Sequence, residues 1–395
     1  MKFTVARSTM ARALALAQRA AAKSRWGGTV PTDTVLLNAN GDGKLDLVTT
    51  DLELAIRCHI PVTVEESGSI ALPVDLLTDL VKALSSDDVA AELNDENQVL
   101  SLISGRDKAQ VHSISVQEFP AVPMPVDEPT VVIAPDVLRR MIDQVVSAAS
   151  EDESRPILAG VLLRFGSSKL TMVGADGYRL AKATVDAEDV EMDEMDVVVP
   201  IRAIKELRKL IAAEQQPIAL YVGESRIIFH VPGGQGRLKG VTEIDLVSKA
   251  IEGTYPNYSQ LIPKSWTTRV VMSITELITA LRPLRALVRA GDVPAVTLYI
   301  GESVILSAWI CYGYTKEEKE NSDRGKAKVN AVIEGQGQKK VCLNSNYLWD
   351  ALQSVKAAGA DQVAMEMTTT TNPVVLRPES SDGCLYLVMP MRSIS

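Results

Sequence analysis

The clearest pattern of apolar and polar positions lies in residues 197–213, which read VVVPIRAIKELRKLIAA. Three consecutive valines predict a strand, and Pro200 follows at a position where a helix can begin. At about 100° per residue, the next residues form an apolar face and an adjacent basic face. The apolar face contains Ala203, Ile204, Leu207, Leu210 and Ile211. The basic face contains Arg202, Lys205, Arg208 and Lys209.

The same strand–helix unit recurs along the chain. One set of copies begins near residues 3, 131 and 270, a spacing of about 130 residues, which is a common domain size. Helix starts are predicted at Ser8, at Pro135–Asp136, and at Ser273, where Glu276 completes a capping box. A second unit begins later in each third, and hairpin strands follow every helix. Each third therefore predicts an α+β arrangement, β-α-β-β-β, written twice.

Two Pro-rich stretches divide the repeats. Residues 119–130 (FPAVPMPVDEPT) and 255–268 (YPNYSQLIPKSWTT) have the composition of linkers. They predict three domains, at 1–127, 128–266 and 267–395. Two polar stretches, 231–240 and 312–338, are expected to be long loops that extend hairpins.

Composition limits the class of protein. The 395 residues are 46% hydrophobic and 23% charged, as in soluble globular proteins, and the net charge is −9. A polyanion partner would therefore have to be held by a local cluster of cations. The first residues, MKFTVARST, have no signal-peptide h-region, and no apolar run is long enough for a membrane span, so we expect neither feature. Four scattered cysteines fit a reducing cytoplasm and predict neither disulfides nor zinc: Cys58, Cys311, Cys342 and Cys384.

Two more predicted helices carry basic stripes. In the first helix of the chain the stripe comprises Arg12, Arg19 and Lys23. In the first helix of the last third it comprises Arg282, Arg285 and Arg289. A solvated outer face is the simplest interpretation. Three stripes in an acidic protein also fit a shared surface that contacts phosphates without reading bases.

Signals for catalysis are weak. The three histidines, His59, His112 and His230, lie in strand contexts and are expected to be structural. Asp51 and Asp176 occupy matching positions beside turns, where an aspartate more often caps a hairpin than binds metal. No phosphate-binding glycine motif is present. The sequence therefore predicts no catalytic residue, metal or cofactor, and an enzyme acting on a phosphorylated substrate is disfavoured.

The C-terminal segment LYLVMPMRS stays apolar close to the chain end, where residues are usually polar. It fits a last core strand. It also fits a methionine-lined groove for a partner's short peptide, because thioether side chains adapt to varied apolar ligands. Both interpretations stay open on the pattern alone.

Five segments stand in a consistent order along the whole chain: MKFTV, TDLE, ADGYRLA, YPNY and LVMPMR. In this combination the sequence resembles the bacterial sliding clamp, the β subunit of DNA polymerase III. The resemblance implies a DNA clamp fold of three repeated domains and a head-to-tail ring dimer around duplex DNA. It implies a non-catalytic processivity factor that tethers the polymerase and is opened by an ATP-driven clamp loader. A repeat-built interaction scaffold without DNA is the alternative.

The resemblance also implies three sets of site residues. Contacts with DNA are expected from Arg155 and Arg202, which match family positions, and from Lys23 and Arg25, which lie near another. The basic face of residues 201–213 adds Lys205 and Lys209 to this set. The dimer interface is expected to pair Ala109 and Val111 with Leu287 and Val288 of the other chain. A pocket for the clamp-binding motifs of polymerase, clamp loader and repair proteins is expected from Leu158, Gly177, Tyr178, Arg179, Leu180, Pro256, Leu261, Asn344, Tyr347, Leu387, Val388, Met389, Pro390, Met391 and Arg392.

Overall fold

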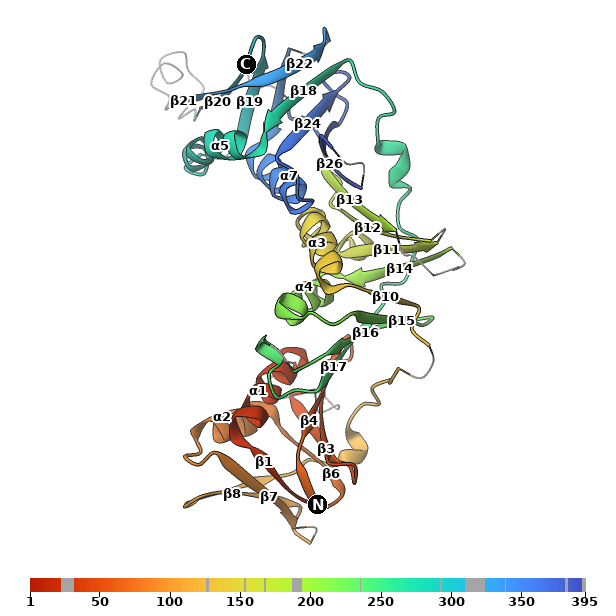
Figure 1. Ribbon diagram of the computed structural model, residues 1–395, viewed down its shortest axis with the longest axis vertical. Helices are drawn as coiled ribbons and strands as arrows, with labels where there is room; N and C mark the ends of the chain where they lie inside the picture. Colours follow the sequence, from red (N-terminus) through yellow and green to blue (C-terminus); the bar gives the residue numbers. More distant parts are fainter. Residues whose placement is uncertain are drawn as a thin grey trace. The chain divides into compact units, whose positions relative to one another are not determined.

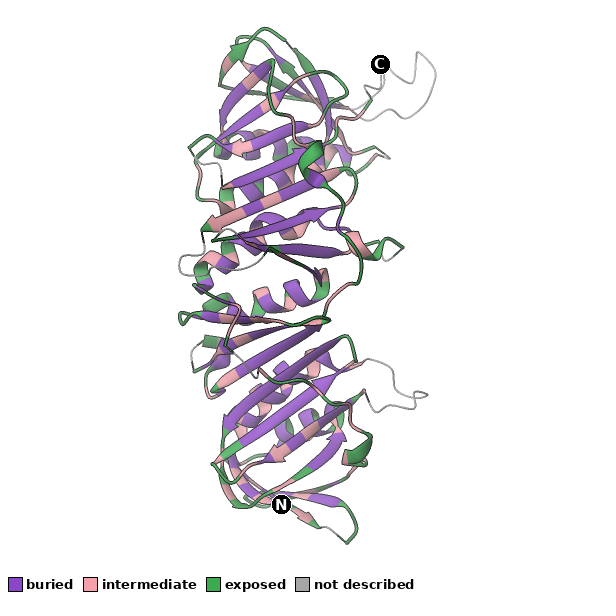
Figure 2. Cartoon of the chain, turned by 90° about the vertical axis from the view of Figure 1, so that its right-hand side faces the viewer, coloured by how far each residue is buried: buried purple, intermediate pink, exposed green. Residues whose placement is uncertain are grey.

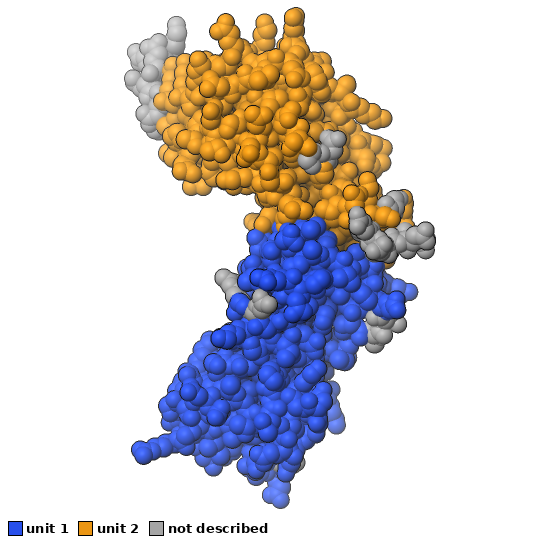
Figure 3. Space-filling model, in the orientation of Figure 1, with its two compact units in different colours: residues 1–139, 202–250 blue, residues 140–201, 251–395 orange. Residues whose placement is uncertain are grey.

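The computed structural model forms two compact units, residues 1–139 with 202–250 and residues 140–201 with 251–395 (Figure 3). We call them unit 1 and unit 2. The structure describes residues 1–22, 32–94, 96–125, 128–152, 154–166, 168–186, 194–234, 236–291, 293–309, 324–337, 339–380 and 383–392.

Unit 1 contains two antiparallel sheets and the helices α1 and α2, which pack on each other (Figure 1). The strand orders are β5-β1-β7-β8-β9 and β10-β15-β16-β17-β4-β3-β2-β6. Its elements are β1 (Lys2–Ala6), α1 (Arg7–Ala17), β2 (Thr34–Ala39), β3 (Lys44–Thr50), β4 (Leu54–Pro61), β5 (Thr63–Glu66), β6 (Gly68–Pro73), α2 (Val74–Ala83), β7 (Asp88–Asn94), β8 (Val99–Ser104), β9 (Asp107–His112), β10 (Val131–Ile133), β15 (Ile218–Val222), β16 (Arg226–Pro232) and β17 (Glu243–Lys249).

Unit 2 also contains two antiparallel sheets, with the helices α5 and α7 in contact with each other. The strand orders are β14-β11-β12-β13-β26-β25-β24-β18-β22 and β21-β20-β19-β23. Its elements are β11 (Gly160–Gly166), β12 (Lys169–Ala175), β13 (Arg179–Asp186), β14 (Met195–Pro200), β18 (Thr268–Ser273), α5 (Ile274–Val288), β19 (Ala295–Ile300), β20 (Val304–Trp309), β21 (Arg324–Val329), β22 (Ala331–Gly335), β23 (Lys340–Asn344), α7 (Ser345–Ala357), β24 (Gln362–Met367), β25 (Val374–Pro378) and β26 (Cys384–Val388).

The element order confirms the predicted repeat. The middle third reads β10-α3-β11-β12-β13 and then β14-α4-β15-β16-β17, where α3 is Pro135–Val145 and α4 is Ile201–Leu210. The outer thirds follow the same plan, with the short strands β5 and β22 added. The fold is thus the predicted α+β repeat.

The two units do not follow the three predicted domains. The middle third is divided because β17 pairs with β4, and β13 pairs with β26, each in one continuous ladder. Hydrogen-bonded ladders therefore join the middle third to the first third and to the last third. One half of the middle third belongs to unit 1, and the other half belongs to unit 2. The boundaries at 127/128 and 266/267 stay a prediction.

Burial follows the predicted faces. In α4 the side chains of Ala203, Ile204, Leu207 and Leu210 are buried, and Ile211 in the following 3-10 turn is buried as well. Figure 2 shows buried residues along the strands and exposed residues mainly at loops. Among the described residues, no helix is long and apolar enough to cross a membrane.

Local predictions were confirmed at some helix ends and wrong at others. Ser273 caps α5 by accepting the Glu276 N–H, as the capping box predicts. The start of α1 at Ser8 was wrong, because the N-cap is Ala6 and the helix begins at Arg7 without a side-chain cap. The α-helix ends at Ala17 and Arg19 lies in the following 3-10 turn, while Lys23 lies outside the described residues.

Two predicted loops contain regular structure. Within 312–338, residues 324–335 form β21 and β22, while 312–323 and 338 lie outside the described residues. Within 231–240, the first two residues are the end of β16, which runs to Pro232, and Leu238 is buried in a 3-10 turn. Polar composition concealed these elements because alternate residues of an edge strand face solvent.

Candidate partner-binding and DNA-facing sites

The hairpin between β12 and β13 is closed by Asp176. Its Oδ1 accepts the N–H groups of Tyr178 at 2.8 Å and Arg179 at 3.0 Å. Gly177 adopts φ +93°, a left-handed conformation that glycine tolerates without strain. The turn leaves 60% of Tyr178 exposed. The hairpin-cap interpretation of Asp176 is thus confirmed.

Asp51 closes the matching hairpin of unit 1 in the same way. Its Oδ1 accepts the N–H groups of Glu53 at 3.1 Å and Leu54 at 2.8 Å. Leu52 takes the place of Gly177 and adopts φ +79°. No group of metal-ligating side chains occurs among the described residues.

Arg179 links the Asp176 turn to α7. Its Nε donates to Asp176 at 2.8 Å, its Nη1 donates to Asp350 at 2.5 Å, and its guanidinium lies 4.4 Å from the centre of the Tyr347 ring. Burial lowers the pKa of Arg179, but the Tyr386 hydroxyl and the two carboxylates outweigh burial and raise it above its ordinary value. Arg179 therefore stays charged and fixes one wall of the site.

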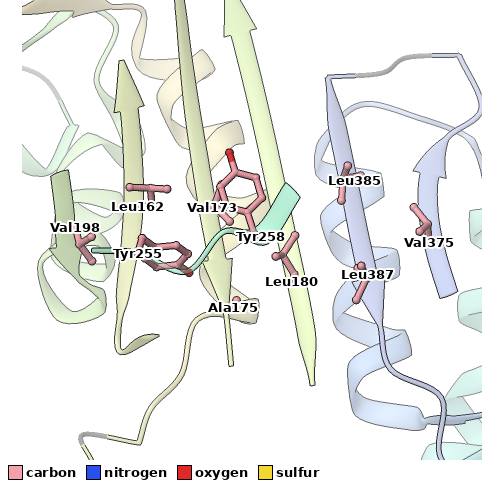
Figure 4. Packing of buried hydrophobic residues seen from close by; sticks show 10 residues of the cluster. All are labelled: Leu162, Val173, Ala175, Leu180, Val198, Tyr255, Tyr258, Val375, Leu385 and Leu387. Atoms are coloured by element: carbon pink, nitrogen blue, oxygen red, sulfur yellow. The ribbon is translucent and has the colours of Figure 1, made fainter. Parts of the chain in front are cut away.

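An apolar cluster continues this wall (Figure 4). Leu180 on β13 and Leu387 on β26 are buried in it, and Leu158 packs against its edge. Tyr255 and Tyr258, from the predicted linker, cover the strands. The structure thus brings Leu158, Leu180 and Leu387 together.

The chain end lies beside the same turn. Leu387 and Val388 are buried, so residues up to 388 form the expected core strand. After them the Met389 N–H donates to the Tyr178 carbonyl, and the Met391 N–H donates to the Cys342 carbonyl, both at 2.8 Å. The Met389 side chain is exposed. The segment therefore supplies a core strand followed by a surface tail that is fixed through its backbone.

The remaining pocket residues also lie in unit 2. Asn344 caps α7 by accepting the Asn346 and Tyr347 N–H groups, which orients the first turn of that helix. Leu261 is 54% exposed and follows Tyr258 in a 3-10 turn. Four further residues of the predicted pocket are exposed or half-exposed: Pro256, Pro390, Met391 and Arg392.

The basic face of α4 is partly compensated by carboxylates. Arg202 forms an ion pair with Asp51 and donates to the Arg19 carbonyl. Lys209 lies 2.6 Å from Glu206, which also lies 3.5 Å from Arg19. Lys205 is exposed. The basic face of α4 therefore belongs to a network in which the carboxylates of Asp51 and Glu206 pair with the cations. Glu206 was not predicted as a partner.

The other predicted basic residues are distributed unevenly. Arg155 is exposed in unit 2, and its Nη1 would lie 3.4 Å from a Cβ on Gly177. Arg285 lies over the Trp349 ring at 4.3 Å and donates to Asn346, so it joins α5 to α7. Lys23 and Arg25 lie outside the described residues.

The predicted dimer residues lie on β9 and α5. Strand β9 is the edge of the five-stranded sheet, and its Ala109 is half-buried. Val111 and Val288 are buried within their own units, whereas Leu287 is half-buried. Of the four, Ala109 and Leu287 therefore offer the accessible surface.

Comparisons with known proteins cover the chain almost end to end. Family models described as the N-terminal, central and C-terminal domains of the DNA polymerase III beta subunit match residues 1–123, 132–257 and 259–392. The beta sliding clamp of Synechococcus elongatus is 31% identical over 397 residues, 99% of both chains. The chain belongs to the beta sliding clamp family. A second relative, the beta sliding clamp of Staphylococcus aureus strain Mu50, is 28% identical over 357 residues, 88% of each chain.

Solved structures share the fold at lower identity. The Bacillus subtilis sliding clamp has a TM-score of 0.87 and 23% identity, covering 100% of this chain and 99% of that one. The Pseudomonas aeruginosa DNA polymerase III subunit beta has a TM-score of 0.84 and 24% identity, with full coverage of both. The fold is the three-domain DNA clamp fold, and the protein acts as a processivity factor of DNA replication, not as an enzyme.

Proposed function

We propose that the chain forms a head-to-tail homodimeric ring that encircles duplex DNA in the cytoplasm. Three domains, 1–127, 128–266 and 267–395, would each contribute two helices to the inner wall. The observation that carries the proposal is the sixfold β-α-β-β-β repeat, because units of one shape joined head to tail form a ring when the rotation between them closes. A closed ring holds DNA by topology, so its lining needs only weak, sequence-independent attraction.

The proposed lining includes Arg155, Arg202, Lys205 and Lys209, with Lys23 and Arg25 as further contacts. Lys205 and Lys209 are exposed on α4, opposite its buried apolar face. Arg202 is 51% exposed at its side chain despite its ion pair with Asp51. Exposed cations on a rigid helix can meet phosphates without ordering a loop.

The proposed partner pocket lies beside the Asp176 turn. It combines exposed apolar side chains, Tyr178, Leu261 and Met389, with the buried wall formed by Leu180 and Leu387. An apolar floor with a fixed charged residue, Arg179, at its edge suits a short peptide that carries apolar anchors. Such peptides would come from the polymerase, the clamp loader and repair proteins.

The proposed dimer pairs the free edge of β9 with the region of α5 around Leu287. An exposed sheet edge offers unpaired N–H and C=O groups to another chain. Ala109 and Leu287 would bring small and branched apolar surfaces into contact.

Loading on circular DNA tests the ring. The variant K205E/K209E should leave the dimer mass unchanged by light scattering and should shorten retention on nicked circular DNA at moderate salt. The matched control is K249E/K264E, which reverses two exposed lysines outside the helices. Equal retention by both variants would contradict the proposed lining. A dimer that never retains circular DNA, even with a loader, would favour a scaffold without DNA encirclement.

A further inference from the structure

The first turn of α7 forms one wall of the partner pocket proposed above. It follows Asn344, whose side chain caps the helix, and it carries Tyr347. On this face Arg179 lies 4.4 Å from the centre of the Tyr347 ring and donates to Asp350 at 2.5 Å. Tyr347 and Asp350 are three residues apart, so they share one face of the helix. A single guanidinium group therefore fixes the pocket side of this turn.

A second arginine holds the adjacent face of the same turn in the same way. Asn346 and Trp349 are also three residues apart, and their face lies about 100° round the helix from the first. Arg285 of α5 donates from Nη2 to Oδ1 of Asn346 at 3.1 Å, and its Cζ lies 4.3 Å from the centre of the Trp349 ring. Arg285 thus combines one hydrogen bond with one stacked aromatic ring, as Arg179 does.

Arg285 differs from the other two arginines of its predicted basic stripe. Arg282 and Arg289 are exposed, whereas Arg285 is half-buried, and its Nε is buried with no hydrogen-bond partner among the described residues. Burial and the neighbouring Arg289 lower the pKa of Arg285, so keeping a cation at this position costs free energy. The contacts with α7 offset that cost, and they commit the guanidinium group of Arg285 to α7.

Asp350 links the two arginines electrostatically. Burial raises the pKa of its carboxyl group, and the nearby Arg179 and Arg285 oppose that rise. Arg285 therefore helps to keep Asp350 ionised, and an ionised Asp350 accepts the stronger hydrogen bond from Arg179. A change at Arg285 thus reaches the pocket wall both through the turn of α7 and through this carboxylate.

We propose that Arg285 is a positioning residue of the partner pocket. It holds the first turn of α7 through Asn346 and Trp349, and so fixes Tyr347 where a partner's short peptide contacts it. Arg285 does not touch the peptide itself. Binding sites need such support because a ligand loses affinity when it must order loosely held side chains. The assignment rests on the pocket proposed above.

Two other roles fit a basic residue on α5. A phosphate contact would need a guanidinium group free to turn toward DNA, but the Trp349 ring covers one face of Arg285 and Asn346 accepts from its Nη2. A purely structural link between α5 and α7 would stabilise the fold without changing the affinity for a peptide. The experiment separates these roles.

The test measures binding of a clamp-motif peptide from the polymerase to the full-length protein by calorimetry. Arg285→Ala should weaken binding about fivefold, as expected for the loss of one partly buried cation–π contact. Trp349→Ala should weaken it similarly, and Trp349→Phe should keep most of the affinity because it retains an aromatic ring. Arg285→Lys keeps the charge but loses the planar group that stacks, so it should bind as weakly as Arg285→Ala. The double variant R285A/W349A should lose little more than either single variant, because both residues act through one contact.

Matched variants make the result specific. Arg282→Ala removes an exposed cation from the same helix and should bind the peptide like the unmodified protein. Val355→Ala removes buried atoms from a later turn of α7, so it should lower the thermal stability but keep the peptide affinity. Thermal unfolding checks that the variants fold, and Arg285→Lys and Trp349→Ala carry the test if Arg285→Ala does not.

The outcomes that overturn the assignment are distinct. Unchanged affinity in Arg285→Ala, when the unmodified protein binds the peptide, overturns the role of Arg285 and leaves the pocket in place. Equal losses in Arg282→Ala or in Val355→Ala would assign the effect to the charge of α5 or to general destabilisation. Shortened retention on nicked circular DNA with unchanged peptide affinity would assign Arg285 to DNA. Failure of the unmodified protein to bind the peptide would overturn the pocket itself, and the role of Arg285 with it.

Discussion

The imidazole Nδ1 of His59 lies 2.6 Å from Oδ1 of Asp46 on the adjacent strand. The same imidazole lies 3.9 Å from Asp245 on β17, the strand that pairs with β4 on its other side. His230 on β16 also bonds Asp245, at 2.8 Å. The two histidines are therefore structural, as predicted, and they join four neighbouring strands of unit 1, β16, β17, β4 and β3.

This cluster predicts a pH dependence of stability. Burial lowers the pKa of His59, but the nearby Asp245 carboxylate and the hydrogen bond with Asp46 outweigh burial and raise it to about 9, from 6.5 for the free side chain. The hydrogen bond with Asp245 also raises the pKa of His230. Because the folded state binds the His59 proton more tightly, its stabilisation is complete below pH 6.5 and is lost as the pH rises through about 9.

Urea unfolding between about pH 6 and 10 measures the effect. The unfolding free energy of unit 1 should fall by roughly 2–3 kcal/mol over this range, since one pKa unit corresponds to ~1.4 kcal/mol. His59→Gln should remove most of the decline, and His112→Gln, at an exposed position on β9, should retain it. The carboxylates within 4.0 Å of His59 are Asp46, Glu243 and Asp245. Arg57 and His230 pair with Asp245, and Lys44 pairs with Glu243. A decline unchanged in His59→Gln would contradict this origin.

Asp51 should stabilise its hairpin mainly through backbone bonds. Asp51→Ala removes the oxygen that accepts two backbone N–H groups and the ion pair with Arg202, and should cost about 2 kcal/mol. Asp51→Asn keeps a side-chain oxygen for the N–H groups and should cost much less, because Arg202 is half exposed. Thermal unfolding compares them, with Asp42→Ala at an exposed turn as the control. Equal losses for the Ala and Asn variants would assign the effect to the ion pair.

Periodicity predicted the elements whose positions depend on burial. The apolar side of α4 and the repeat order were found because a helix that packs on a sheet needs an apolar residue at every third or fourth position. The start of α1 was missed because Ala6 has no capping side chain. Strand β21 was missed because three of its outward residues are Arg324, Lys326 and Lys328, although their alternation was visible in the sequence.

Site contacts were harder to predict because they join distant segments. The hairpin cap at Asp176 is local, and its sequence neighbourhood was sufficient to predict it. The bond from Arg179 to Asp350 spans 171 residues, and no helical pattern identifies that partner. Glu206 has one partner that the helical spacing does indicate, Lys209 three residues on, and one that it does not, Arg19, which lies 187 residues away.

Removal of residues 389–395 should abolish binding of clamp-motif peptides. The Met389 backbone bonds Tyr178, and Met391 bonds Cys342, so the deletion removes an apolar edge together with two contacts that fix it. The buried strand through Val388 is retained, and the protein should stay folded and dimeric. Peptide titration by calorimetry measures the loss. Deletion of residues 393–395 alone is the control and should bind normally; unchanged affinity in the longer deletion would contradict the proposed groove.

Neutralising Glu206 should increase DNA retention. Glu206 compensates both Lys209, at 2.6 Å, and Arg19, at 3.5 Å, within the basic network of α4. If these cations face duplex DNA, Glu206→Gln raises the local positive charge by one and should lengthen the lifetime of the loaded protein on nicked circular DNA. The gain should shrink as salt rises, because released counterions dominate the binding free energy. Glu334→Gln on β22, which removes an ion pair with Arg269, changes the net charge equally and should leave the lifetime unchanged. A longer lifetime in both variants would assign the effect to overall charge, and no change in either would place the α4 cations away from DNA.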